Sequence, residues 1–124
     1  MARLDISERQ MSDVTVLDLS GDITFGEGNV LLRAEIRRLL AEGRNKIFLN
    51  FARVEYLDSS GIGELVSGFT AVSRENGKLK FLNLPPRIYQ LLAITKLLTV
   101  FDVAETAAEA SAETSCDARE LSTR

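Results

Sequence analysis

The stretch from Tyr56 to Val72, YLDSSGIGELVSGFTAV, decides how the rest of the chain is interpreted. It follows an apolar run over residues 47–51 that is typical of a strand. Apolar residues then recur at the spacing of one buried helical stripe, at Ile62, Leu65, Val66, Phe69 and Val72. The sequence therefore predicts a strand followed by a helix that begins near Ser59.

The start of this predicted helix is rich in small and polar residues. Asp58, Ser59 and Ser60 lie where backbone N–H groups lack internal partners, and side chains of these types accept hydrogen bonds from such groups. Helix capping is the simplest interpretation, with Ser60 as the expected cap. Gly61 and Gly63 exceed what a cap needs, and each costs about 1 kcal/mol if it is helical. They would let another backbone or another protein approach closely, which makes this corner a candidate binding site.

Length and composition indicate one compact domain. The 124 residues are 45% hydrophobic and 27% charged, which is ordinary for a globular protein. A net charge of −3 argues against nucleic acid as the main partner. The single cysteine, Cys116, allows no internal disulfide, and no apolar run approaches the length of about 20 residues that spans a bilayer. With no secretory signal pattern at the N-terminus either, we expect a cytoplasmic protein without membrane insertion.

The order of apolar patterns predicts an α/β fold. We expect strands over residues 4–6, 14–19, 46–51, 79–84 and 100–103, and helices that begin near residues 30, 59, 85 and 104. Residues 20–22 read as a turn and residues 24–29 as a loop. This order predicts a mixed, mostly parallel β-sheet with an N-terminal hairpin and with helices packed on it. Residues 1–112 would form the single domain, and residues 113–124 a polar, disordered tail.

The predicted topology also indicates which edge of the sheet carries the functional residues. Parallel sheets carry their functional residues beyond the carboxyl ends of the strands. Asp58 and Ser59 follow the central strand, and the turn over residues 21–28 would lie beside them if its strand neighbours the central one.

Several chemistries are excluded by missing residues. The chain has no histidine, so it holds neither a Ser-His-Asp triad nor the common histidine zinc sites. Val66 stands where a dinucleotide fingerprint needs its third glycine, and no phosphate-binding Walker motif is present. A response-regulator receiver would need two acidic residues after its first strand and a lysine after its last, which the pattern does not supply. We therefore predict no enzyme activity, no catalytic residue, no bound metal and no cofactor.

The motif over residues 57–63, Leu-Asp-Ser-Ser-Gly-Ile-Gly, resembles the Asp-Ser-Ser/Thr-Gly-Leu-Gly signature of the STAS-domain anti-sigma factor antagonists, also called anti-anti-sigma factors. Gly21-Asp22-Ile23 and the segment over residues 77–103 extend the resemblance over about residues 4–110. It implies a STAS-like fold. It also implies that the serine after the aspartate, here Ser59, is the phosphorylation site.

The resemblance implies a mechanism as well. The unphosphorylated form would bind an anti-sigma factor that is a serine kinase, and so free a sigma factor. Phosphorylation of Ser59 would end this binding. ATP and magnesium are expected on the partner kinase.

Under this hypothesis, Asp58 orients the Ser59 hydroxyl or meets a basic group of the partner, while Gly61 and Gly63 permit close approach. The remaining candidate partner-binding residues are Ser60, Ile62, Asp22, Thr24 and Phe25. For Phe25 a place in the core is an equal alternative.

Two positions depart from the family pattern. Thr24 replaces an aspartate that usually lies near the phosphorylation site. Glu27 stands where a serine or threonine normally starts the next helix.

Two other roles fit the same fold. The chain could be a non-switching scaffold subunit of a stress-signalling complex, or a STAS accessory subunit that binds the ATPase of a lipid transporter. Whether it forms a homodimer is open at this point.

Overall fold

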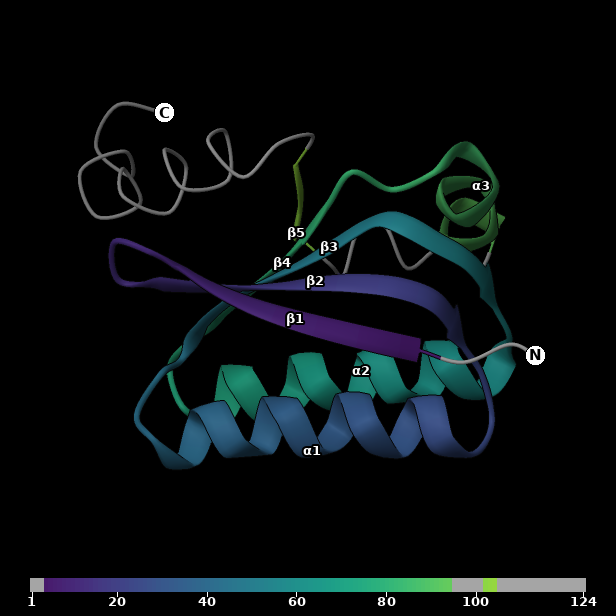
Figure 1. The fold of residues 1–124 in the computed structure, drawn as a ribbon. Coiled ribbons are helices and arrows are strands. Elements are labelled where there is room, and N and C mark those ends of the chain that lie inside the picture. Colours follow the sequence, from purple (N-terminus) through teal and green to yellow (C-terminus); the bar gives the residue numbers. More distant parts are fainter. Residues whose placement is uncertain (1–3, 95–101, 105–124) are drawn as a thin grey trace.

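A computed structural model describes residues 4–94 and 102–104 of the chain. Its elements are β1 (Leu4–Met11), β2 (Val14–Ile23), α1 (Glu27–Ala41), β3 (Lys46–Leu57), α2 (Ser59–Arg74), β4 (Lys78–Leu82), α3 (Pro86–Ile94) and β5 (Asp102–Ala104). The strands form one sheet in the order β1-β2-β3-β4-β5. β1 and β2 pair antiparallel, and the other neighbours pair parallel. The predicted mixed sheet with an N-terminal hairpin is confirmed (Figure 1).

The elements are arranged in layers around the sheet. Helices α1 and α2 lie side by side against one face of the sheet. α3 lies beside the C-terminal end of β3 (Figure 1). The main core fills the space between the sheet and α1 and α2, with Leu32, Leu39 and Leu65 from the helices and Leu49, Phe51 and Phe81 from the strands. A smaller cluster, Val14, Val16, Phe48 and Leu82, uses alternate positions of the strands and therefore the other face of the sheet.

β3 is longer than the sequence predicted, because it continues past Phe51 to Leu57. Val54 and Leu57 are buried in the main core, while residues 52–53 and 55–56 are exposed. The polar residues interrupt the apolar run, which is why the prediction ended early. Residues 20–22 were also predicted wrongly as a turn: they lie in β2, next to two register shifts between β2 and β3.

Two details of the helices correct the predictions. α1 begins at Glu27 and not at residue 30, because Gly28 and Asn29 are buried in its first turn. In α2, Val66 was expected in the buried stripe but is 36% exposed, and Glu64 is buried instead. At the helix ends, Gly43 follows α1 with φ 81°, and the Gly77 N–H donates to the Val72 carbonyl after α2.

The end of the chain is only partly described. Residues 102–104 pair with β4 as a short last strand, close to the one expected. Most of the helix predicted from residue 104, the tail over residues 113–124 and Cys116 lie outside the described residues. Within the described part, none of the helices is both long and apolar enough to cross a membrane.

Candidate functional site

The carboxyl ends of two central strands bring the predicted site together. β2 and β3 are parallel neighbours, and Ile23 at the end of β2 pairs with Leu57 at the end of β3. Each strand leads directly into a helix, so the first turns of α1 and α2 lie next to each other (Figure 1). The residues predicted from two separate motifs therefore meet at one edge of the sheet.

Asp58 is the N-cap of α2, where the sequence had suggested Ser60. Its backbone is extended, with φ −104° and ψ −177°, and its Oδ1 accepts from the Gly61 N–H at 2.8 Å. Ser60 donates its hydroxyl to the same Oδ1 at 2.6 Å, so it supports the cap without being one. The Phe25 N–H donates to Oδ2 at 3.3 Å. These hydrogen bonds, led by that from Ser60, hold the pKa of the Asp58 carboxyl below its ordinary value.

Ser59 is the first residue of α2, and its side chain is exposed. The Asp58 carboxylate accepts from Ser60, Gly61 and Phe25 and not from Ser59. Ser59 is therefore an exposed serine at the positive end of a helix dipole. The alternative role of Asp58, a contact with a basic group of the partner, stays a prediction.

The two glycines of the motif differ in role. Gly61 is buried, and a Cβ there would overlap the Ile23 carbonyl oxygen and come within 2.7 Å of Leu57 Cδ1. It serves the packing of α2 against the strand ends, which is the close approach of another backbone that the sequence allowed, while a contact of Gly61 with a partner stays a prediction. A Cβ on Gly63 would meet nothing within 4 Å, and this position is exposed. Ile62 is half-buried and packs against the main core, so only part of its side chain is accessible.

The connection between β2 and α1 supplies the rest of the site. Asp22 and Thr24 are half-buried, whereas the Phe25 side chain is 86% exposed. The alternative prediction, that Phe25 lies in the core, is therefore wrong. Its backbone hydrogen bond to Asp58 ties this exposed aromatic residue to the N-cap of α2.

A polar ladder between α1 and α2 was missed by sequence reasoning. Asn29 Nδ2 donates to Ser60 Oγ at 3.1 Å. One turn further along, the Arg33 guanidinium forms two hydrogen bonds to the Glu64 carboxylate, which is 6% exposed. Residues four apart share a helix face, so the pairs 29 and 33 and 60 and 64 carried a signal. The signal becomes readable only once the two helices are known to be parallel neighbours.

The ladder ends at the N-cap. Asn29 donates to Ser60, and Ser60 donates to Asp58, so α1 and the start of α2 share one chain of hydrogen bonds. Asn29 is 8% exposed, and its Oδ1 is buried without a hydrogen-bond partner within the described residues. A buried acceptor of this kind lowers stability unless another group satisfies it.

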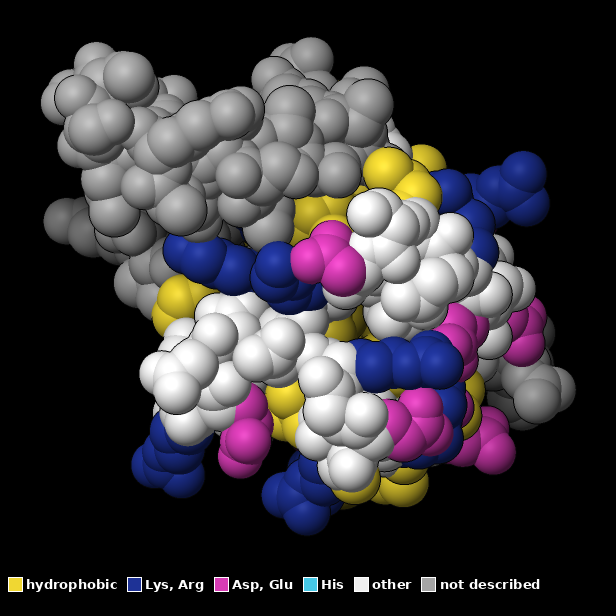
Figure 2. Space-filling model, turned by 90° about the vertical axis from the view of Figure 1, so that its left-hand side faces the viewer, with side chains coloured by type: hydrophobic (Ala, Val, Ile, Leu, Met, Phe, Trp, Pro, Cys, Tyr) yellow, Lys and Arg dark blue, Asp and Glu magenta, His cyan; other side chains and the backbone are white. Residues whose placement is uncertain are grey.

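Away from the candidate site, basic side chains form ion pairs with acidic ones. On α1, Arg38 pairs with Glu8, Glu35 and Glu42. Figure 2 shows the end of the molecule opposite the candidate site, where basic and acidic side chains are interspersed. Lys46 pairs with Asp13 there at 2.6 Å. Among the described residues, no group of three acidic or cysteine side chains is arranged to hold a metal ion.

Comparison with known proteins identifies the architecture. The family model described as STAS domain matches residues 5–110. The anti-sigma-B factor antagonist of Bacillus subtilis is 28% identical over 100 residues, which cover 81% of this chain and 90% of that protein.

Two solved structures share the fold. An anti-sigma factor antagonist from Mycobacterium paratuberculosis matches with a TM-score of 0.77 at 20% identity, over 88% of this chain and 92% of that one. The phosphorylated form of the Bacillus cell fate determinant SpoIIAA matches with a TM-score of 0.68 at 22% identity, over 89% and 99%.

Proposed function

Because the chain belongs to the STAS domain family, we propose that it is an anti-sigma factor antagonist whose binding is switched by phosphorylation of Ser59. The unphosphorylated form binds an anti-sigma factor that is a serine kinase, and a sigma factor is released. The kinase supplies ATP and magnesium. The names of the similar proteins support the antagonist role, and the exposed hydroxyl of Ser59 at the start of α2 supports the switch.

The position of Ser59 suits a modification that leaves the fold intact. A phosphate at a helix N-terminus is stabilised by free N–H groups and by the helix dipole. Ser59 is exposed, so a phosphate there displaces no core residue. The hydrogen bonds of the N-cap belong to Asp58 and Ser60 and do not involve Ser59.

The same phosphate would change the surface that a partner meets. It adds about −1.5 to −2 charges directly beside Asp58, whose lowered pKa keeps it ionised at neutral pH. A partner that approaches the open surface at Gly63 and the exposed ring of Phe25 would then meet two adjacent negative groups. Binding is lost through repulsion and desolvation, without unfolding.

The test is intact mass with site mapping after incubation with ATP, magnesium and each serine-kinase anti-sigma factor of the host. Ser59→Ala is the variant, and Ser67→Ala is the matched control, because Ser67 is an exposed serine on the same helix. One added phosphate on Ser59, absent only in Ser59→Ala, supports the proposal. If no host kinase adds phosphate while a complex still forms, the switch is wrong and a constitutive scaffold role takes its place.

A further inference from the structure

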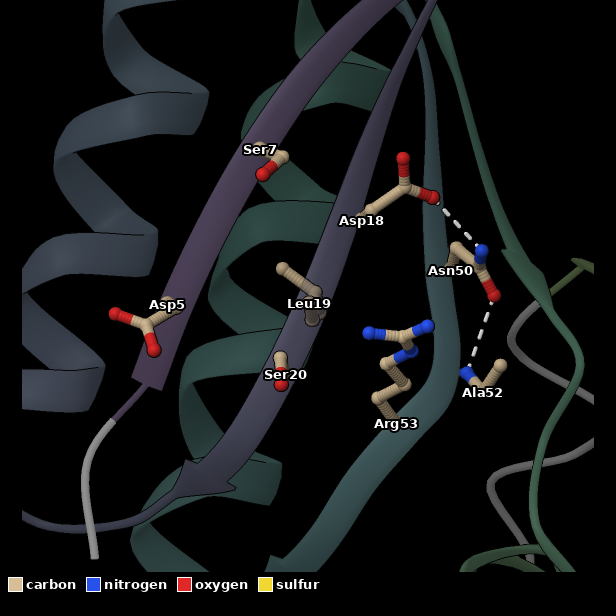
Figure 3. A pocket seen from close by; sticks show the side chains of 8 residues that line it. All are labelled: Asp5, Ser7, Asp18, Leu19, Ser20, Asn50, Ala52 and Arg53. Atoms are coloured by element: carbon tan, nitrogen blue, oxygen red, sulfur yellow. Dashed lines mark hydrogen bonds between the residues drawn. The ribbon is translucent and has the colours of Figure 1, made fainter.

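The outer face of the sheet carries a polar hollow that the proposed function does not use. It measures about 370 Å³ and lies across β1, β2 and β3, on the side away from α1 and α2 (Figure 3). The side chains that matter in it are Ser7 of β1, Asp18 and Ser20 of β2, and Asn50 and Arg53 of β3.

A strand irregularity creates the hollow and places Arg53 in it. Asp18 pairs with Asn50 but Ser20 pairs with Arg53, so β3 contains one residue more than β2 at this point. Such a bulge disturbs the alternation of side chains and redirects one of them. Ala52 and Arg53 are accordingly both exposed, and the Arg53 side chain points from β3 toward Leu19 and Ser20 (Figure 3).

The acidic group at the centre of the hollow is already neutralised. Asp18 accepts from Arg9 Nε at 2.6 Å and from Asn50 Nδ2 at 2.7 Å, and the Arg9 hydrogen bond is the main cause of its lowered pKa. Asn50 in turn accepts from the Ala52 N–H and from Asn83 Nδ2, so its carbonyl is occupied. Asp18 and Asn50 are therefore held in place by hydrogen bonds and form the base of the hollow.

The groups that remain available are donors. Within the described residues the Arg53 side chain makes no hydrogen bond or ion pair, and only its charge acts on Asp18. The hydroxyls of Ser7 and Ser20 line the same hollow. Among the described residues, the other acidic side chain that lines the hollow is that of Asp5, whose carboxylate lies at the outer side of β1, away from Arg53 (Figure 3).

From this arrangement we propose that the hollow binds a small anion, a carboxylate or a phosphate, with Arg53 as the charged donor and the serine hydroxyls as neutral donors. A guanidinium donates two parallel hydrogen bonds to either kind of anion. The proposal is independent of Ser59, which lies at the strand ends and not on this face.

The experiment is a titration of the ¹⁵N-labelled protein, followed by amide chemical shifts at constant ionic strength. Inorganic phosphate and acetate are the two probes. Saturable shifts centred on Ser20, Ala52 and Arg53 are expected, and the probe that produces them identifies the class of anion. Arg53→Gln should weaken binding about tenfold or more, because a charged hydrogen-bond donor is lost. Arg37→Gln, an exposed arginine on the helix layer, is the matched control and should leave the affinity unchanged.

Two results would overturn the proposal. Shifts that rise linearly with both probes and never saturate would show only non-specific ion effects. Saturable binding that is equally strong in Arg53→Gln would show that another part of the surface holds the anion. Arg53 is exposed and unpaired within the described residues, so its replacement should not prevent folding.

Discussion

The Phe25 backbone N–H donates to the Asp58 carboxylate at 3.3 Å, across 33 positions of the sequence. This hydrogen bond ties the connection after β2 to the first turn of α2. It places the exposed ring of Phe25 and the exposed hydroxyl of Ser59 at one edge, so a change of charge at Ser59 acts on a surface that both segments form.

Asp58→Ala should destabilise the protein by about 1–2 kcal/mol, because it removes the N-cap of α2 and leaves the Gly61 and Phe25 N–H groups without their acceptor. Urea unfolding at pH 7 measures the change. Asp5→Ala is the matched control, since Asp5 is an exposed carboxylate on the edge strand. Equal stability of the wild type and Asp58→Ala would mean that the cap contributes nothing.

The stability that Asp58 provides should depend on pH in one direction. Its pKa in the folded protein lies below the ordinary value of 3.8. The stabilisation is therefore fully present above that value and is lost as the pH falls through the folded pKa. The difference in unfolding free energy between the wild type and Asp58→Asn, measured from pH 7 down to acid, should be constant at first and then shrink. A difference that grows on acidification would contradict the assigned direction.

Gly61→Ala and Gly63→Ala should have opposite consequences for stability. The first puts a Cβ into the Ile23 carbonyl and should cost about 2 kcal/mol or more. The second meets nothing within 4 Å in a helix and should be neutral or stabilising by up to about 1 kcal/mol. Thermal unfolding of both variants checks this. Partner affinity should fall in Gly63→Ala although its fold is intact, and unchanged affinity would argue against close approach at that position.

Arg33→Ala should destabilise the protein measurably. It leaves the Glu64 carboxylate buried without its ion-pair partner, although the exposed half of Arg33 limits the loss through solvent screening. A double-mutant cycle with Glu64→Gln isolates the coupling between the two side chains. Additive effects of the two substitutions would show that the pair does not join α1 to α2.

Phe25→Ala should leave the unfolding free energy within about 0.5 kcal/mol of the wild type, because the side chain is 86% exposed. It should weaken binding to the partner kinase about tenfold, as expected for an aromatic anchor at an interface. Val30→Ala, at 59% exposure on α1, is the control for loss of surface apolar area. Equal affinities of the two variants would remove Phe25 from the interface.

The sequence predicted those features that depend on local pattern. Within the described residues, alternation and helical spacing identified the strands and helices in order, and the Asp-Ser-Ser-Gly motif located the start of α2 at the edge of the sheet. The edge could be placed because parallel strands of one sheet bring their carboxyl ends together.

Features that depend on contacts between distant segments could not be predicted. Gly61 reads as an opening for either another backbone or another protein until Ile23 is seen against it, 38 positions away in the chain. Glu64 reads as a surface residue until α1 brings Arg33 to it. The bulge that exposes Arg53 depends on the pairing of β3 with β2, which no local spacing reveals.

The central claim is that phosphate on Ser59 controls partner binding, and calorimetric titration of the partner kinase tests it most directly. The unmodified protein and the protein phosphorylated on Ser59 are compared, with circular dichroism to confirm equal folding. The account predicts tight binding by the unmodified form and a loss of at least about a hundredfold in affinity on phosphorylation, in line with the penalty for burying adjacent like charges. Equal affinity of the two forms, with both correctly folded, would contradict it.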